Sequence, residues 1–251
     1  MAERIIDSHI HLNLKKERPL EDLLAQMDAN QVERSMLILN NDEERKAFCA
    51  EISVYKENKH RLWVASGLNI HDDNSQKKTD ELFDMGIRVC IKIHPHMFGL
   101  TKEEIPEVLK VLEEYETPVI VDALYYGKEI EYHNGVEYGV AIGRAFPERK
   151  MVIAHAGSLD FLKCMMATRY MPNVFYDYSF TQSFFNRTSL RMDMVDFLRR
   201  TTNKIMWGSD FPSFAIDKAY SDFMSIAEEA GITNEQLRDV LYNNAIKVYG
   251  T

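Results

Sequence analysis

The feature that most constrains the fold is a regular alternation of short apolar, β-branched segments with longer amphipathic ones. Eight short segments occur between residues 4 and 210 of the 251-residue chain. Segments of this kind are typical of strands that are buried on both faces, as in parallel βαβ units. The predicted strands are residues 4–12, 35–40, 61–69, 87–94, 118–124, 150–157, 173–179 and 204–210.

The intervening segments favour a closed barrel. Helices are predicted over residues 19–30, 101–116 and 190–200, among others. Eight strand–helix units at this length predict a single (β/α)8 TIM barrel, and we expect one domain covering residues 1–251. An open, doubly wound α/β sheet is the alternative. No G-x-G-x-x-G sequence follows the first strand, which removes the main argument for a nucleotide-binding sheet of that type.

Charge and cysteine content narrow the class of protein. The formal net charge of −9 disfavours nonspecific binding of nucleic acid or of an anionic membrane. No apolar segment approaches the ~20 residues that span a bilayer, and the first residues lack the order of a secretory signal. Cys49, Cys90 and Cys164 are scattered, which is typical of reduced thiols. We expect a cytoplasmic protein that binds a small molecule, but neither nucleic acid nor membrane.

Polar side chains follow the apolar part of several predicted strands. In a (β/α)8 barrel the carboxyl ends of the strands meet at one face, where the chemistry gathers. His9 and His11 lie two residues apart and therefore point to the same side of the first strand. The other titratable groups at strand ends are Lys92, His94, Asp122, His155, Asp177 and Asp210.

Four of these residues form a set with metal-binding character. One histidine at a strand end is as often a hydrogen-bonded core residue as a ligand, and an H-x-H pair alone is a weak signal. His9 and His11 together with His155 and Asp210 are a stronger combination. Imidazole and carboxylate are the usual ligands of a catalytic zinc or similar ion that keeps one position open for water.

The same residues lie in segments that resemble the amidohydrolase superfamily. The likeness is greatest to its amidohydrolase-related branch, which includes hydrolases and decarboxylases similar to aminocarboxymuconate-semialdehyde decarboxylase. The matching segments, in family order, are DSHIH (7–11), IRVCIKIHP (87–95), MVIAHAG (151–157), IMWGSDFP (205–212) and VLYNNAIKVYG (240–250). The resemblance implies that His9, His11 and His155 bind a divalent metal. It also implies that Asp210 lies beside the metal as general base, with ligation as the alternative.

One position departs from the pattern of that branch, which usually carries a histidine at the end of the fifth strand. This chain has TPVIVDALYYG there and places Asp122 at the position. Asp122 can also ligate a divalent ion, but an anion in place of a neutral imidazole makes the ion a weaker Lewis acid. Manganese then competes better with zinc. A decayed, noncatalytic metal site is the alternative.

Lys92 has three possible roles. Some members of the superfamily carry a carboxylated lysine on the fourth strand that bridges two metals, and CIKIHP resembles that segment loosely. Because the fourth and fifth strands are neighbours, Lys92 and Asp122 are instead expected to form an ion pair, or Lys92 holds a substrate carboxylate. We favour ion pairing or substrate binding over carboxylation.

Two predicted loops at the same face, residues 124–135 and 179–187, are rich in aromatic side chains. Apolar clusters at a barrel mouth suit a ligand pocket or a subunit contact in a homo-oligomer, and both alternatives stay open. Arg187 lies among the phenylalanines of the second loop. It is a candidate for binding a substrate carboxylate, with a surface salt bridge as the alternative.

The remaining polar candidates have simpler interpretations. Asp7 is either a hydrogen-bond partner of the ligands or polar filler of the lower barrel. His94 and His96 are expected to line a turn, and His133 to face solvent in its loop. Asp177 orients ligands or substrate, or forms hydrogen bonds within its own loop.

These observations together favour a metal-dependent hydrolase that activates water for attack on a carbonyl, ester or amide-type carbon. His155 would ligate or polarise the substrate oxygen, and Asp210 would take the proton and later deliver it to the leaving group. Nonoxidative decarboxylation of an acidic ring compound is the alternative within the same family. A noncatalytic ligand-binding protein is the alternative from another class.

Overall fold

The computed structural model describes residues 4–125 and 129–250, and its strands form a single eight-stranded parallel sheet in sequence order. All eight predicted strands are present, and the closed (β/α)8 barrel is confirmed. The strands are β1 (Ile5–Ile10), β2 (Val32–Leu39), β3 (Leu62–Gly67), β4 (Val89–Ile93), β5 (Val119–Val121), β6 (Met151–Ile153), β7 (Val174–Asp177) and β8 (Ile205–Met206).

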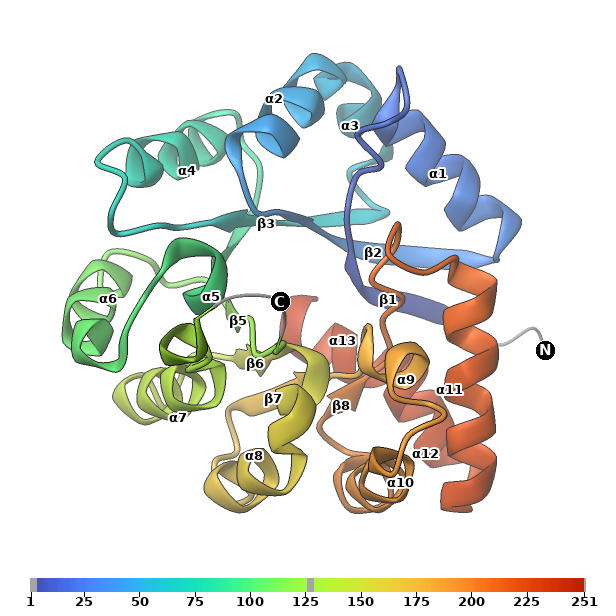
Figure 1. Ribbon diagram of the computed structural model, residues 1–251. Coiled ribbons are helices and arrows are strands. Elements are labelled where there is room, and N and C mark those ends of the chain that lie inside the picture. Colours follow the sequence, from blue (N-terminus) through green and yellow to red (C-terminus); the bar gives the residue numbers. More distant parts are fainter. Residues whose placement is uncertain (1–3, 126–128, 251) are drawn as a thin grey trace.

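Helices form a ring around the strands (Figure 1). The described helices are α1 (Pro19–Ala29), α2 (Asp42–Ala50), α3 (Ile52–Asn58), α4 (Ser75–Asp84), α5 (Pro95–Phe98), α6 (Ile105–Leu112), α7 (Gly135–Ala145), α8 (Phe161–Thr168), α9 (Thr181–Phe184), α10 (Leu190–Thr201), α11 (Ile216–Ala230), α12 (Asn234–Arg238) and α13 (Asn244–Tyr249). Helical turns with other hydrogen-bonding patterns are η1 (Lys102–Glu104), η2 (Ile130–Tyr132), η3 (Ala154–Asp160) and η4 (Asp239–Asn243). None of the helices in the described ranges is both long and apolar enough to cross a bilayer.

Predicted and observed boundaries differ where local hydrogen bonding or backbone conformation intervenes. The predicted helix over 101–116 is divided, because the Thr101–Glu104 capping box opens the separate turn η1 before α6 begins. The predicted strand over 150–157 ends at Ile153, because the backbone enters positive φ at His155 and Ala156. These residues leave the sheet, and their side chains point in directions that a regular strand does not allow.

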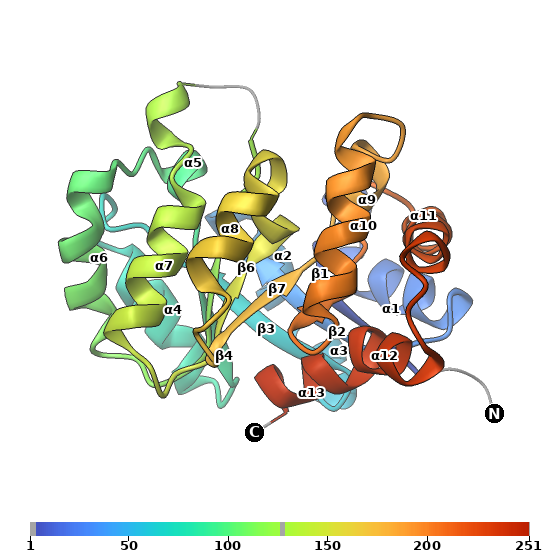
Figure 2. The ribbon, with the colours of Figure 1, turned by 90° about the horizontal axis from the view of Figure 1, so that it is seen from below.

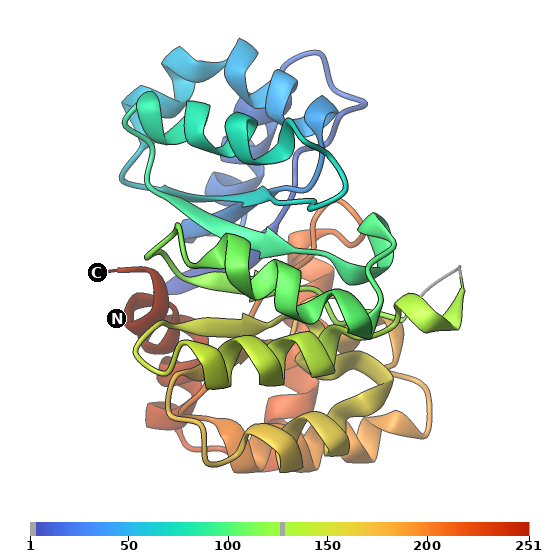
Figure 3. The same ribbon diagram turned by 90° about the vertical axis from the view of Figure 1, so that its left-hand side faces the viewer.

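The barrel has two cores, one inside the sheet and one between the sheet and the helices. Side chains of the inner core come from alternate strand positions, such as Met36 and Ile38 on β2, and pack against Val248 and Tyr249 of α13. Figures 2 and 3 place α12 and α13 at the end of the barrel opposite α5 and α9. The C-terminal helix therefore closes the amino end of the barrel, which leaves the carboxyl end open for a site.

A change of face in β1 brings its histidines to the barrel interior. Ile6 already packs in the inner core, so uninterrupted alternation would point His9 outward. The pairing of β1 with β2 shifts register between Asp7 and Ile10. His9, within that interval, and His11, just after it, both line the interior cavity.

The barrel closes between β1 and the segment that follows β8. The Ser8 amide donates to the Trp207 carbonyl at 3.0 Å, and the Asp210 amide donates to the His9 carbonyl at 2.9 Å. Gly208 permits this approach, since a Cβ there would lie 3.1 Å from both the amide nitrogen and the Cβ of His9. His9, His11 and Asp210 are therefore neighbours across the seam.

Candidate functional site

A cavity of about 420 Å³ opens at the carboxyl end of the strands. Its walls include Leu12, Met97, Leu124 and Phe180, which make part of the lining apolar. The imidazole and carboxylate side chains in the lining are His9, His11, Glu44, His94, Asp122, His155 and Asp210. These side chains form two groups with different hydrogen-bonding character.

His9 presents an unprotonated nitrogen to the cavity. Its Nδ1 lies 3.0 Å from Asp177 Oδ2, and a carboxylate oxygen only accepts, so Nδ1 carries the hydrogen. Burial lowers the pKa of His9 to about 4, against the opposing effect of Asp177, and keeps the ring neutral. Nε2 therefore offers a lone pair, and it lies 3.5 Å from Asp210 Oδ1.

His11 is arranged in the same way from the next inward position. Its Nδ1 donates to the Ile38 carbonyl at 3.1 Å, so Nε2 of the neutral ring carries the lone pair. That Nε2 lies 3.8 Å from Asp210 Oδ1. Burial alone would lower the pKa of His11, but Glu44 and Asp210 outweigh it and raise the pKa. Two imidazole nitrogens thus approach one carboxylate oxygen.

Asp210 reaches this position through a strained backbone. Its φ is +61°, in the left-handed region that residues other than glycine rarely adopt. The conformation is held by the amide bond to His9 described above and by a 2.8 Å bond from the Ser213 amide to the Asp210 carbonyl. Strain of this kind persists only where the surroundings enforce it, and it is common at functional sites.

His9, His11 and Asp210 fit a divalent cation. Their nearest ligand atoms all lie within 4.8 Å of one another. Two neutral imidazoles and one carboxylate match the donor set of catalytic zinc, and both Nδ1 atoms are oriented by acceptors, as is usual for metal-binding histidines. Without a cation or proton between them, two lone pairs face a carboxylate oxygen, which is electrostatically unfavourable.

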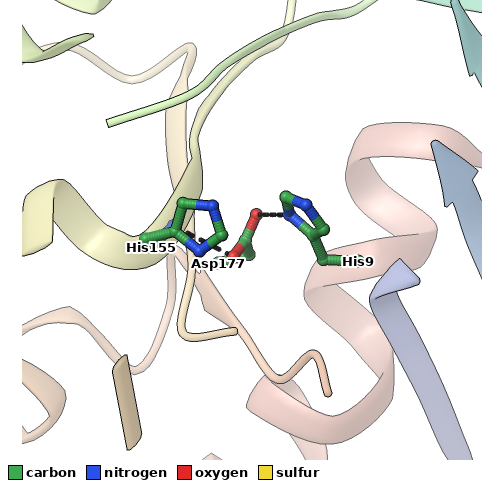
Figure 4. A group of neighbouring side chains, drawn as sticks. All are labelled: His9, His155 and Asp177. Carbon is green, nitrogen blue, oxygen red and sulfur yellow. Dashed lines mark hydrogen bonds and ion pairs between the residues drawn. The ribbon is translucent and has the colours of Figure 1, made fainter. Parts of the chain in front are cut away.

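His9, His155 and Asp177 also lie close enough to be considered as a metal-binding group. In Figure 4, however, Asp177 lies between the two imidazoles and is bonded on both sides. Its Oδ2 accepts from His9, and its Oδ1 accepts from the amides of His155 and Ser179, each at 3.1 Å. Although burial opposes ionisation, His9 lowers the pKa of Asp177. Asp177 orients the histidines instead of offering a free ligand atom.

The second group centres on Asp122 and consists of hydrogen-bond donors. Asp122 Oδ2 lies 3.0 Å from Lys92 Nζ, 3.1 Å from His155 Nε2 and 3.5 Å from His94 Nε2. Its Oδ1 accepts from the Leu124 amide at 3.0 Å. Burial alone would raise the pKa of Asp122, but its cationic and imidazole neighbours hold the pKa well below the usual range.

His155 carries a proton toward Asp122. Its Nδ1 lies 3.0 Å from the Ser179 carbonyl and therefore donates to it. Burial alone would lower the pKa of His155, but Asp122 outweighs burial and raises the pKa to about 9. His94 donates from the opposite nitrogen of its ring, because its Nδ1 accepts from the Met97 amide at 3.2 Å.

The expected pairing of Lys92 with Asp122 is present in the structure. Lys92 is completely buried and lies outside the cavity lining, so it contacts Asp122 instead of a cavity ligand. Asp122 faces His155 and Lys92 and belongs to neither of the two possible metal-binding groups found among the described residues. Arg187 is exposed and is not part of the cavity wall.

Several residues have more specific positions than the sequence indicated. His94 lines the cavity as well as capping α5, and Asp7 Oδ1 accepts from the Ser209 amide at 2.9 Å. His133 is half-buried instead of facing solvent, and its ring centroid lies 4.9 Å from that of His96. Residues 126–128 of the aromatic loop lie outside the described residues. Glu44 was not anticipated, and its place in an acidic helix start gave no signal of a site.

Comparison with known proteins gives the family. The amidohydrolase family model matches residues 67–251, well over half of the chain. The chain belongs to the amidohydrolase family. This membership supports an enzyme, although a comparison with curated proteins gives no match.

Solved structures share the fold over the whole chain. An uncharacterised TIM-barrel protein from Bordetella bronchiseptica has a TM-score of 0.77 at 14% identity, with 98% of each chain covered. A probable 2-pyrone-4,6-dicarboxylic acid hydrolase from Acinetobacter baumannii has a TM-score of 0.64 at 15% identity, covering 99% of this chain and 100% of that one. An N-isopropylammelide isopropylaminohydrolase from Burkholderia multivorans has a TM-score of 0.68 at 10% identity, covering 99% and 75%. At these identities the likeness shows the fold alone.

Proposed function

We propose that the chain is a metal-dependent hydrolase in which His9, His11 and Asp210 hold one divalent ion and His155 moves a proton. The observation that carries this proposal is the approach of two imidazole Nε2 atoms to Asp210 Oδ1, at 3.5 and 3.8 Å. Zinc is the proposed ion, because two imidazoles and one carboxylate are a common catalytic zinc set. When bound, such an ion polarises a carbonyl oxygen and lowers the pKa of water.

His155 and Asp122 form the proton-transfer pair of this proposal. His155 lines the cavity, and its ring centroid is 4.8 Å from that of His9. In its neutral form Nε2 accepts a proton from water, and in its protonated form it gives one to a leaving group. The Ser179 carbonyl accepts from Nδ1 in both forms and fixes the ring, and Asp122 accepts from Nε2 in the protonated form. In this proposal His155 transfers the proton and Asp210 is a ligand, whereas the family resemblance implied Asp210 as general base and His155 as a ligand.

Nonoxidative decarboxylation is the second candidate. Phe180 lines the cavity, and its ring stands edge-on to the His155 ring at 6.2 Å between centroids. A flat apolar wall beside a proton donor suits an acidic ring compound whose carbon must be protonated as carbon dioxide leaves. Both reactions use the same cavity, and their products distinguish them.

The experiment is an assay of metal-depleted protein, before and after addition of Zn²⁺, against lactones, cyclic amides and ring carboxylates. We expect turnover of at least one class that appears only with the added ion, with a hydrolysis product. Release of carbon dioxide without hydrolysis would replace the first candidate by the second. Turnover that is equal with and without the ion would contradict the metal-dependent proposal.

A further inference from the structure

Glu44 occupies an unusual place for an acidic residue in the first turn of a helix. Its side chain is only 9% exposed and forms part of the cavity wall. Oε2 accepts from the Asn40 amide at 2.6 Å, at the carboxyl end of β2. Oε1 lies 3.4 Å from Nδ1 of His11. The two carboxylate oxygens therefore contact different groups, the backbone before α2 and one of the proposed metal ligands.

The two proposed histidine ligands thus each have a carboxylate at Nδ1, but the carboxylates come from different parts of the fold. His9 is backed by Asp177, which is completely buried at the end of β7. Nδ1 of His11 faces the Ile38 carbonyl and the Glu44 carboxylate, and Glu44 belongs to α2. The carbonyl is enough to fix the tautomer. The carboxylate adds a negative charge that increases the electron density of the ring.

We propose that Glu44 is a positioning residue for the metal site, which holds His11 in orientation and strengthens its Nε2 as a ligand. The proposal rests on the metal site proposed above. Partners of this kind, behind metal-binding histidines, typically change metal affinity by about 10–100-fold when they are removed. Because Glu44 belongs to α2, it also couples the start of that helix to the metal site.

A purely structural role makes a different prediction. The Asn41 side chain accepts from the Glu44 amide at 3.0 Å and caps α2, and Glu44 reaches back to the Asn40 amide. If Glu44 serves only to start the helix, its replacement lowers stability and leaves the metal affinity of the folded protein unchanged. Removal of the Asn41 cap would then have the same effect.

The test compares Glu44→Gln with Asn41→Ala by calorimetric titration of Zn²⁺ into metal-depleted folded protein, with thermal unfolding of each metal-free variant. The Asn40 amide and His11 Nδ1 face different oxygens of Glu44, and Gln replaces one of these oxygens by an NH2 group that cannot accept. We expect Glu44→Gln to bind Zn²⁺ about 10–100-fold more weakly than wild type. Asn41→Ala should lose stability but keep the wild-type affinity.

Equal Zn²⁺ affinity in wild type and Glu44→Gln would overturn the role of Glu44 while leaving the metal site intact. An equal loss of affinity in both variants would also overturn it, because the effect would then come from α2 and not from the contact with His11. If the wild type itself binds no Zn²⁺, both this proposal and the proposed function fail.

Discussion

The two sides of the cavity floor face each other with opposite hydrogen-bonding character. On the side of β1 and β8, two imidazole lone pairs approach Asp210 Oδ1, and no hydrogen lies between these atoms in the neutral histidines. On the side of β4 to β6, three nitrogen donors surround Asp122 Oδ2 within 3.5 Å. The ring centroids of His9 and His155, one from each side, are 4.8 Å apart.

This contrast identifies the side of the cavity that can take up a cation. The negative charge of Asp122 is already balanced, because Lys92 and a protonated His155 both donate to its carboxylate. On the side of His9, His11 and Asp210, the Glu44 and Asp210 carboxylates raise the pKa of His11, and a divalent cation at the two Nε2 atoms would take the place of a proton on that ring. We therefore assign cation binding to one side and proton transfer to the other.

The largest expected effect comes from removing both imidazoles on the cation side. His9→Ala/His11→Ala should abolish metal binding and metal-dependent turnover, because only Asp210 of the three proposed ligands remains. Metal content of purified protein, measured by elemental analysis, checks this. The matched control is His60→Ala/His71→Ala, which removes two histidines outside the cavity and should keep the metal. Unchanged metal content in the first variant would contradict the assignment.

Removing the proton-transfer group on the opposite side should affect the rate and not the metal. His155→Gln should lower kcat by about 10²–10⁴-fold, the usual contribution of a general acid–base group. Zn²⁺ affinity should stay within a few-fold of wild type, because His155 Nε2 faces Asp122. Loss of the metal together with the rate would instead make His155 a ligand and would remove the distinction between the two sides.

The Lys92–Asp122 pair should matter for stability. Breaking a buried ion pair by removing one partner costs about 3–5 kcal/mol, and we expect Lys92→Met to lose that amount in urea unfolding. The control is Lys163→Met, whose partners Glu137 and Asp160 form a surface network worth about 0–1 kcal/mol. Zn²⁺ affinity should be unchanged in both variants. A Lys92→Met protein as stable as wild type would show that the pair does not hold this side together.

The smallest effect is expected at the junction between the two sides. The Ser179 hydroxyl donates to Asp177 behind His9 and lies 3.0 Å from Nδ1 of His155. Ser179→Ala removes one net hydrogen bond, worth about 1 kcal/mol of stability. Because the Ser179 carbonyl still accepts from His155, kcat should fall less than tenfold, as steady-state kinetics would show. A fall comparable to that of His155→Gln would mean that the hydroxyl, and not the carbonyl, orients His155.

Part of this arrangement could be read from the sequence. Apolar periodicity predicts all eight strands, and barrel closure places Asp210 beside His9 and His11. Adjacent strands also predict the pairing of Lys92 with Asp122. These inferences need only strand order and the direction of side chains along a strand.

The remainder depends on local backbone geometry that periodicity does not carry. The register shift in β1 turns His9 inward, and positive φ at His155 and Asp210 directs those side chains. The contact between Glu44 and His11 joins residues 33 positions apart through the start of a helix. Arg187 is exposed, which agrees with the surface alternative for this residue and not with a place in the cavity wall.

The central claim is that a single divalent ion binds on the β1–β8 side of the cavity. The most direct test is a crystal structure of Zn²⁺-loaded protein with anomalous diffraction data collected at the zinc absorption edge. We predict one strong anomalous peak in the cavity, about 2.0–2.2 Å from His9 Nε2, His11 Nε2 and an Asp210 oxygen. A peak on Asp122 beside Lys92 or His155, or no peak in the cavity, would contradict the account.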